Sequence, residues 1–154
     1  MPATTPSRRA TRAWAIGAGA TLLVVMVIMT ACSDSEPESL PGSNWRLTTL
    51  DDAAPVEGST ITLGFDDQGM ATGSGGCNRY FGGVTIDGDQ ITFGTLGATR
   101  VACEPPILDQ EFAYLAALES AAMYRLDGPS LTLHDAQGAT LATFEAIEEA
   151  AQAG

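Results

Sequence analysis

The sequence contains no lysine, and all seven of its basic residues are arginines. Three of these arginines lie within the first 12 residues, so the rest of the chain holds four arginines against 19 acidic residues, a net charge of −15. Such a charge argues against nucleic acid as a partner, because phosphate binding requires clustered cations. The acidic residues are spread along the chain, which favours a role in solubility over a cationic partner or a divalent-ion site.

Catalytic signatures are also missing. The single histidine, His134, lies at the end of an expected strand, and no Gly-x-Ser-x-Gly or C-x-x-C motif or complete calcium loop occurs. A glycan-acting enzyme that uses turn carboxylates remains a rival interpretation, with Asp66, Asp67, Asp87 and Asp89 as its candidates. We expect a non-enzymatic protein without a catalytic residue, metal site or cofactor.

The N-terminal residues are typical of a secretory signal. The three early arginines precede an apolar segment over residues 13–31. Its end, Met29-Thr30-Ala31-Cys32, resembles a bacterial lipobox, in which cleavage before the cysteine is coupled to its lipidation. We expect a signal peptide over residues 1–31, a lipid on Cys32, and a membrane-anchored domain in the cell envelope, on its periplasmic or extracellular face. The alternative is an uncleaved anchor, because the apolar segment approaches the length of a membrane span.

Three regions are expected after the lipobox. Residues 32–42 are polar and form a flexible tether. Residues 43–146 form the folded domain, which is small enough for a disulfide to contribute much of its stability. Residues 147–154 form a frayed acidic tail.

Alternating apolar residues separated by polar turns predict short antiparallel strands. We expect these strands at residues 44–50, 60–65, 70–73, 84–86, 90–93, 123–126, 131–134 and 140–144. One helix is expected over residues 107–121, with an apolar stripe formed by Leu108, Phe112, Leu115, Leu118 and Ala122. The predicted fold class is α+β, a small curved antiparallel β-sheet or partial barrel with one packed helix.

A curved sheet closed by a helix could also hold an apolar ligand or acyl chain in its interior. This ligand-binding module is the first rival to the leading hypothesis, a non-enzymatic, lipid-anchored envelope domain with a stress-related or binding role. The two differ in whether five apolar side chains fill the interior or line a void: Leu63, Phe65, Phe93, Phe112 and Leu133.

The stretch from residue 73 to residue 83 contains five glycines and is interpreted as a tight corner, not a strand interior. Cys77 lies within it, and Cys103 follows 26 positions later. In an exported chain this pair is predicted to form a disulfide. In the chain-entropy model, closing this loop stabilises the fold by about 3.5 kcal/mol. Asn78 is expected to satisfy backbone groups of the turn or to adopt a left-handed conformation. Arg100 is expected to be half-buried and paired with an acid.

Four blocks of the sequence carry a family resemblance: Gly76-Cys77-Asn78-Arg79-Tyr80, Gly88 to Phe93, Thr99-Arg100-Val101-Ala102-Cys103, and Glu111-Phe112. They resemble the META domain, the family of the HslJ-type bacterial lipoproteins, from about Trp45 to Phe144. Val101 stands where the family often has methionine, and Gly83 where an aromatic residue is common.

The resemblance implies a small α+β domain with a strongly curved antiparallel sheet and an envelope location. It implies structural roles for Gly76, Asn78, Thr99 and Arg100. It also implies a link to the heat-shock response and to novobiocin tolerance, without enzymatic activity. The expected partners are the membrane, reached through the lipid anchor, and an envelope protein or apolar ligand.

Overall fold

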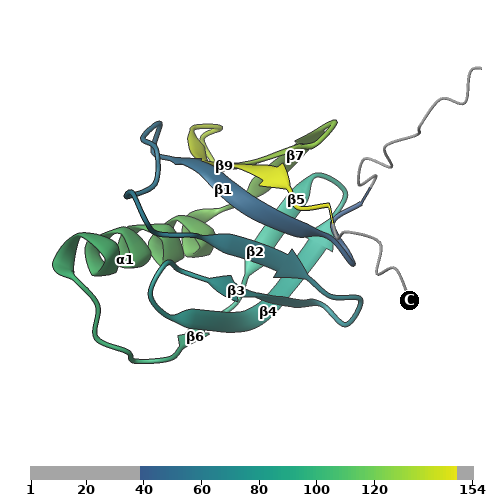
Figure 1. The fold of residues 1–154 in the computed structure, drawn as a ribbon. Helices are drawn as coiled ribbons and strands as arrows, with labels where there is room; N and C mark the ends of the chain where they lie inside the picture. The colour runs from purple at the N-terminus through teal and green to yellow at the C-terminus, as the bar shows by residue number, and fades with distance from the viewer. Residues whose placement is uncertain (1–38, 149–154) are drawn as a thin grey trace, which may run out of the picture. The chain divides into compact units, whose positions relative to one another are not determined.

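The computed structural model describes residues 39–148 (Figure 1). The predicted signal peptide, the lipobox and Cys32 lie outside these residues. The elements in chain order are β1 (Asn44–Leu50), β2 (Thr62–Phe65), β3 (Met70–Ser74), β4 (Arg79–Asp87), β5 (Gln90–Phe93), β6 (Gly97–Ala98), α1 (Pro105–Ser120), β7 (Met123–Asp127), β8 (Ser130–His134) and β9 (Thr140–Ala146). No helix in this part of the chain combines the length and hydrophobicity needed to cross a bilayer.

The antiparallel sheet closes on itself as a barrel. Its strands follow the order β3-β2-β1-β9-β8-β7-β5-β4, and β3 pairs with β4 from Met70↔Gly83 to Ser74↔Arg79. β6 adds a short pairing to β4. The predicted antiparallel sheet with one packed helix is confirmed, but the barrel is closed where the prediction was a partial one. Alternation along each strand indicates which of its faces is buried, whereas closure depends on which distant strands meet.

The helix covers the core beside the shortest strand pairing of the barrel. β5 and β7 share one registered pair, Gln90↔Met123. α1 packs against β5 and β9, and its Tyr114 and Leu118 are fully buried in the core. Figure 1 shows α1 on the side of the barrel that the chain reaches after β6. The helix is therefore part of the wall that encloses the core.

The barrel interior is filled by apolar side chains. Of the five residues that distinguish a filled barrel from a hollow one, four belong to one buried core cluster: Leu63, Phe65, Phe93 and Leu133. The fifth, Phe112, is 66% exposed on the outer face of α1. The interior therefore offers less support for an apolar-ligand site than the outer face does.

The face of α1 that packs on the barrel differs from the predicted stripe. Of the predicted residues in α1, Leu118 is buried, Leu108 and Leu115 are half-buried, and Phe112 is exposed. The helix buries Glu111, Tyr114, Ala117 and Leu118. Two of these are polar and find their hydrogen-bond partners in distant parts of the sequence, which helical periodicity does not reveal.

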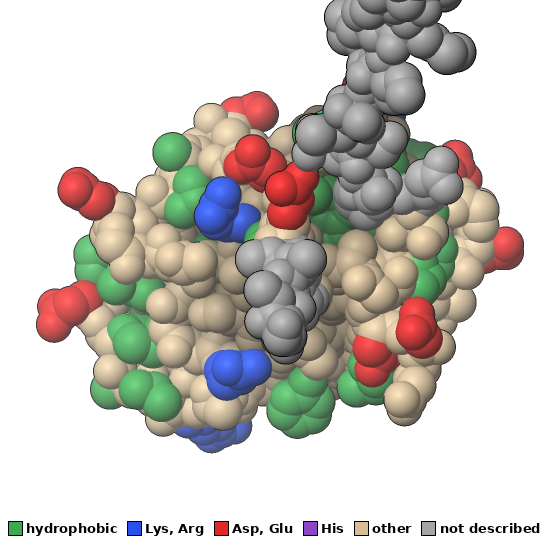
Figure 2. All heavy atoms as spheres, turned by 45° about the vertical axis from the view of Figure 1, so that its right-hand side comes forward, with side chains coloured by type: hydrophobic (Ala, Val, Ile, Leu, Met, Phe, Trp, Pro, Cys, Tyr) green, Lys and Arg blue, Asp and Glu red, His purple; other side chains and the backbone are tan. Residues whose placement is uncertain are grey.

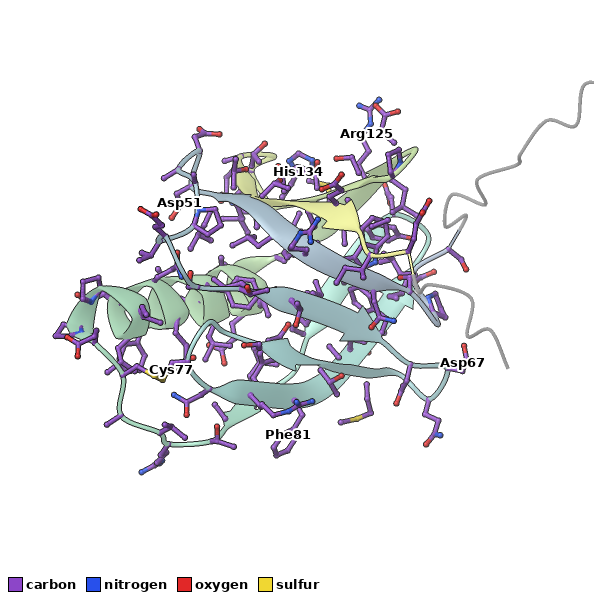
Figure 3. The ribbon with its side chains drawn as sticks, viewed as in Figure 1. Asp51, Asp67, Cys77, Phe81, Arg125 and His134 are labelled. Atoms are coloured by element: carbon purple, nitrogen blue, oxygen red, sulfur yellow. A yellow bond between two sulfur atoms is a disulfide. The ribbon has the colours of Figure 1, made fainter. Side chains whose placement is uncertain are left out.

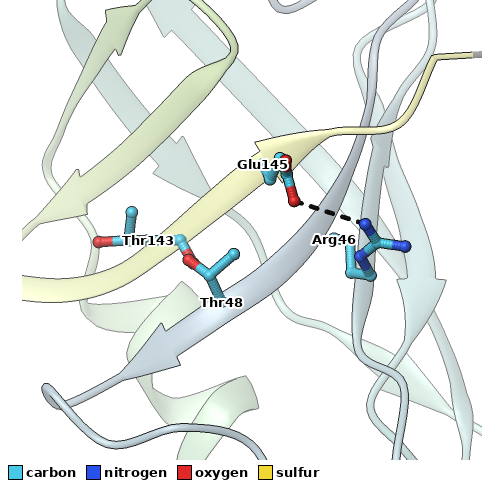
Figure 4. A network of polar contacts seen from close by, with 4 residues as sticks. All are labelled: Arg46, Thr48, Thr143 and Glu145. Atoms are coloured by element: carbon cyan, nitrogen blue, oxygen red, sulfur yellow. Dashed lines mark hydrogen bonds and ion pairs between the residues drawn. The ribbon is translucent and has the colours of Figure 1, made fainter.

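The strand pair β1–β9 joins the two ends of the domain. Arg46 and Glu145 form an exposed ion pair at 3.4 Å, and the Thr48 hydroxyl donates to the Thr143 carbonyl at 3.0 Å (Figure 4). An ion pair this exposed contributes little to stability, so the strand pairing itself carries the connection.

The folded domain begins before residue 43. Leu40 is 1% exposed, and the Gly42 N–H donates to the Phe65 carbonyl at 2.8 Å. The predicted tether over residues 32–42 is therefore too long at its C-terminal end, since a polar composition did not disclose the one leucine that packs on the core. At the other end, the Ile147 N–H donates to the Asn44 carbonyl at 2.8 Å, one residue into the predicted tail.

Candidate functional site

The glycine-rich stretch is only partly a corner. β3 ends at Ser74 and β4 begins at Arg79, so the turn itself comprises residues 75–78. Gly82 and Gly83 lie inside β4, which corrects the prediction of a corner over the whole stretch. A Cβ atom on Gly82 would lie 2.6 Å from Leu96 Cδ2, so a glycine in this strand lets another segment approach closely.

The turn is fixed by backbone conformation and by the disulfide. Gly76 has a φ of 105°, in the left-handed region that favours glycine. Cys77 and Cys103 form the predicted disulfide, with their Cα atoms 6.1 Å apart. Figure 3 shows Cys77 beside the end of α1 that the preceding loop enters. The bond thus ties the turn to the start of the helix.

A buried polar pair, Glu111 of α1 and Asn78 of the turn, lies next to the disulfide. Each is 4% exposed. The Glu111 carboxylate accepts the backbone N–H groups of Cys77 (3.2 Å) and Asn78 (2.6 Å) and the side-chain Nδ2–H of Asn78 (2.7 Å). No described arginine lies within ion-pair distance of Glu111. Its carboxylate is therefore held by N–H donors and not by a cation.

Asn78 extends the connection to the segment over residues 98–102. Its Oδ1 accepts the Val101 N–H at 2.6 Å and the Thr99 hydroxyl at 2.9 Å. The Thr99 N–H donates to the Arg79 carbonyl at 2.9 Å. Asn78 therefore satisfies backbone groups, as predicted. It does not adopt the left-handed alternative. The turn, α1 and this segment are held together through one asparagine and one glutamate.

Arg100 differs from its prediction. Its side chain is exposed, and it forms no ion pair with a described aspartate or glutamate. The predicted lock on the corner is provided instead by the neighbouring backbone of Val101, which Asn78 binds. Thr99 is exposed as well, but its hydroxyl is held in the polar cluster.

An apolar groove of about 520 Å³ lies between residues 98–102 and the outer face of α1. Asn78 and Glu111 contribute to its lining. Its apolar lining consists of Ala98, Val101, Ala102, Leu108, Phe112 and Leu115. Val101 is 59% exposed and Phe112 66%, although both are large apolar side chains. Leu108, Phe112 and Leu115, three residues of the predicted apolar stripe, thus form one wall of this groove.

Two buried tyrosines lie beneath this site: Tyr114 on the inner side of α1 and Tyr80 on the inner side of β4. The hydroxyl groups of Tyr80 and Tyr114 are 2.8 Å apart, and Tyr80 donates to the Thr62 carbonyl at 2.9 Å. Burial raises the pKa of Tyr80 well above its ordinary value. Burial raises the pKa of Tyr114 as well, with smaller contributions from the nearby Tyr80 charge and hydrogen bond. Both phenols are therefore neutral hydrogen-bonding groups near neutral pH.

Of the four candidate aspartates, Asp66 stabilises its own turn, whereas Asp67, Asp87 and Asp89 make no side-chain hydrogen bond to a described residue. The Asp66 Oδ1 accepts the N–H groups of Gln68 and Met70, and Asp135 binds its own turn in the same way. His134 lies far from Cys77 in Figure 3. Figure 2 shows acidic side chains spread over the visible face. Within residues 39–148, no group of three or more potential metal ligands occurs.

Sequence reasoning missed two features, the role of Glu111 and the groove. One signal for the first was available, because Glu111 lies on the same helical face as Leu118, where an acid is out of place unless it has a buried partner. The groove has no such signal, because an apolar stripe on a helix has the same sequence pattern whether it faces the core or the outside.

The chain is similar to several known proteins. A model of the META domain matches residues 38–148. The NMR structure of a protein from Burkholderia xenovorans is 32% identical, with a TM-score of 0.59 over 71% of this chain and 84% of that one. A second NMR structure is 23% identical, with a TM-score of 0.56 over 69% and 90% of the two chains. The crystal structure of a DUF4847 family protein from Bacteroides vulgatus is 15% identical, with a TM-score of 0.51 over 70% and 94%. No curated protein matches the chain.

Proposed function

The chain belongs to the META domain family, and we propose that it is a lipid-anchored, non-enzymatic binding domain of the cell envelope. In this proposal the groove beside α1 is the binding site. The role it serves is tolerance of stress or of an antibiotic such as novobiocin, as the resemblance to HslJ-type lipoproteins suggests.

One observation carries the binding role: an outer helical face is apolar although the core beneath it is complete. Phe112 and Val101 are more than half exposed, while the barrel interior is filled by other side chains. Solvent-exposed apolar side chains that gather along a groove are typical of interaction sites. The proposal therefore assigns binding to the outside of the barrel.

The lipobox supports the lipid anchor in this proposal. The position of the first buried residue limits the distance between that anchor and the domain. Leu40, the first buried residue described, follows Cys32 by eight positions. Eight extended residues span at most about 28 Å. A lipid on Cys32 would therefore hold the domain close to the membrane surface.

The two rival functions have less support. An acyl chain inside the barrel would compete with Leu63, Phe65, Phe93 and Leu133 for the same space. A glycan-acting enzyme would need a carboxylate pair free to act on a substrate. Of the four candidate aspartates, Asp66 is engaged by the backbone of its own turn, and the remaining pair, Asp87 and Asp89, does not line the groove.

The anchor is tested by the intact mass of the full-length protein after expression in a bacterial host. We expect the wild-type chain to lose residues 1–31 and to gain the mass of a lipid, and the Cys32→Ala variant to gain none. A wild-type product that retains its N-terminus would contradict the lipoprotein part and favour the uncleaved anchor.

The binding role is tested in cells with two matched phenylalanine variants. Phe112→Ser removes an exposed ring from the groove, and Phe81→Ser removes an exposed ring outside its lining. Strains carrying each variant at the native locus are compared for growth in novobiocin and after heat shock. We expect Phe112→Ser to behave like a deletion and Phe81→Ser like the wild type. Wild-type growth of Phe112→Ser, at equal protein level, would contradict the proposal.

A further inference from the structure

The segment that borders the groove has a free backbone edge. The N–H groups of Thr99 and Val101 donate toward β4, to the Arg79 carbonyl (2.9 Å) and to Asn78 Oδ1 (2.6 Å). The N–H and carbonyl groups of Arg100 and Ala102 make no hydrogen bond to any described residue. This alternation is that of an extended strand with one edge paired and the other open.

The unpaired edge belongs to residues that line the groove. Arg100 and Ala102 line it, as do their neighbours Thr99 and Val101, and α1 contributes Leu108, Phe112 and Leu115. These three helix residues are spaced by four and three positions, so they form one apolar stripe. A strand edge with an apolar helix face beside it presents backbone hydrogen bonds and side-chain pockets together, which suits an extended peptide.

The exposed charge in the groove lining is that of Arg100, because the other charged lining residue, Glu111, is buried and bound by N–H donors. Arg100 lines the groove, and Arg79 lies next to it in the strand that binds Thr99. Both are exposed, and neither pairs with a described acid, whereas Arg46 pairs with Glu145. In a chain with 19 acidic residues, two free arginines beside one apolar groove favour an acidic ligand.

We infer that the groove binds an extended peptide segment of an envelope protein, which adds as a strand to the edge of residues 98–102. Its apolar side chains contact the stripe on α1, and an acidic side chain or C-terminal carboxylate binds Arg100. A fatty acid would satisfy the stripe and the arginine but would leave the backbone edge unpaired. This inference rests on the proposed binding function and specifies its occupant.

The test is a selection of random peptides of about eight residues, the length of one strand. The full chain is held in phosphatidylcholine nanodiscs, and empty nanodiscs serve for counter-selection. We expect the selected peptides to share apolar residues at alternate positions and at least one acid. N-methylation of alternate backbone N–H groups in a selected peptide should abolish binding, because it removes donors to the strand edge.

Three variants connect binding to the groove. We expect Phe112→Ser to weaken the selected peptides by at least about tenfold, as for the loss of a central aromatic contact. Arg100→Gln should weaken them by about fivefold and lower the salt dependence. Arg125→Gln changes an exposed arginine outside the groove lining and should stay within about twofold. Thermal melts confirm that each variant folds.

The proposal is overturned if no peptide is enriched over empty nanodiscs, if Phe112→Ser binds the selected peptides as well as the wild type does, or if N-methylated peptides bind unchanged. Sodium laurate is titrated in parallel, with amide NMR shifts of residues 98–102 as the readout. Laurate binding at the groove without peptide enrichment would overturn the inference that a peptide occupies the groove and leave the proposed binding function intact. A groove that binds neither, together with wild-type growth of Phe112→Ser cells, would overturn both.

Discussion

Asn78 and Glu111 form two hydrogen bonds with each other inside the domain, although 33 positions separate them in the sequence. The Asn78 backbone N–H donates to Glu111 Oε2 at 2.6 Å, and its Nδ2–H donates to Oε1 at 2.7 Å. The asparagine then binds Val101 at the edge of the groove. The pair therefore positions both walls of the groove, the helix and the extended segment, relative to one turn.

Removing this carboxylate is expected to be costly. Glu111→Ala leaves the backbone N–H groups of the half-buried Cys77 and the buried Asn78 without an acceptor and removes the shorter hydrogen bond of the Asn78 Nδ2 group. We expect the free energy of unfolding to fall by about 3 kcal/mol. Glu111→Gln should cost less, because it keeps one acceptor oxygen. Urea unfolding followed by circular dichroism measures both, with Asp109→Ala on the exposed side of α1 as the control. A Glu111→Ala variant as stable as Asp109→Ala would show that the pair is not structural.

Gly75 is expected to resist substitution because of the same carboxylate. A Cβ atom at Gly75 would lie 2.7 Å from both Cγ and Oε2 of Glu111. Gly75→Ala should therefore displace the glutamate and lower the free energy of unfolding by about 1–3 kcal/mol, as overpacking does. Gly83→Ala is the matched control, because nothing lies within 4 Å of a Cβ there. Equal unfolding midpoints for the two variants would contradict this account.

The disulfide is expected to stabilise the domain chiefly by closing the loop between Cys77 and Cys103. With a sequence separation of 26, the chain-entropy model predicts a loss of about 3.5 kcal/mol in a variant with both cysteines replaced by serine. Reductant should lower the melting temperature of the wild type and leave that of the double variant unchanged. A wild-type melting temperature that does not respond to reductant would count against the prediction.

Much of the fold followed from local patterns. The strands at residues 44–50 and 90–93 were predicted at their observed bounds, because alternation of apolar residues reports which side of a strand is buried. β6 was missed, since a strand of two residues, Gly97 and Ala98, has no period to detect. The disulfide was predictable because assigning Cys32 to the lipobox leaves two cysteines in a chain expected to be exported. Barrel closure was not, because it depends on a long-range pairing between β3 and β4.

The candidate site was less predictable than the fold, for a physical reason. The stripe of Leu108, Phe112 and Leu115 was recognised, but its periodicity does not say which side of the helix meets the core. That choice was made by Tyr114 and Glu111, whose polar groups are satisfied by Tyr80 and Asn78 from distant strands and turns. Buried polar pairs of this kind decide the orientation of an element and stay invisible until their partners are known.

The buried tyrosines predict a loss of stability at alkaline pH. Burial raises the pKa of Tyr80 and of Tyr114 above the ordinary value of 10.0, so the folded chain keeps both protons where the unfolded chain loses them. Stability is therefore fully present below pH 10.0 and falls above it, by up to about 1.4 kcal/mol per pH unit for each tyrosine. The absence of lysine leaves few other side chains that titrate in this range. Denaturant unfolding between about pH 9 and 11 measures the slope, which Tyr80→Phe should roughly halve. A double variant, Tyr80→Phe with Tyr114→Phe, that keeps the full slope would assign the alkaline loss to other groups.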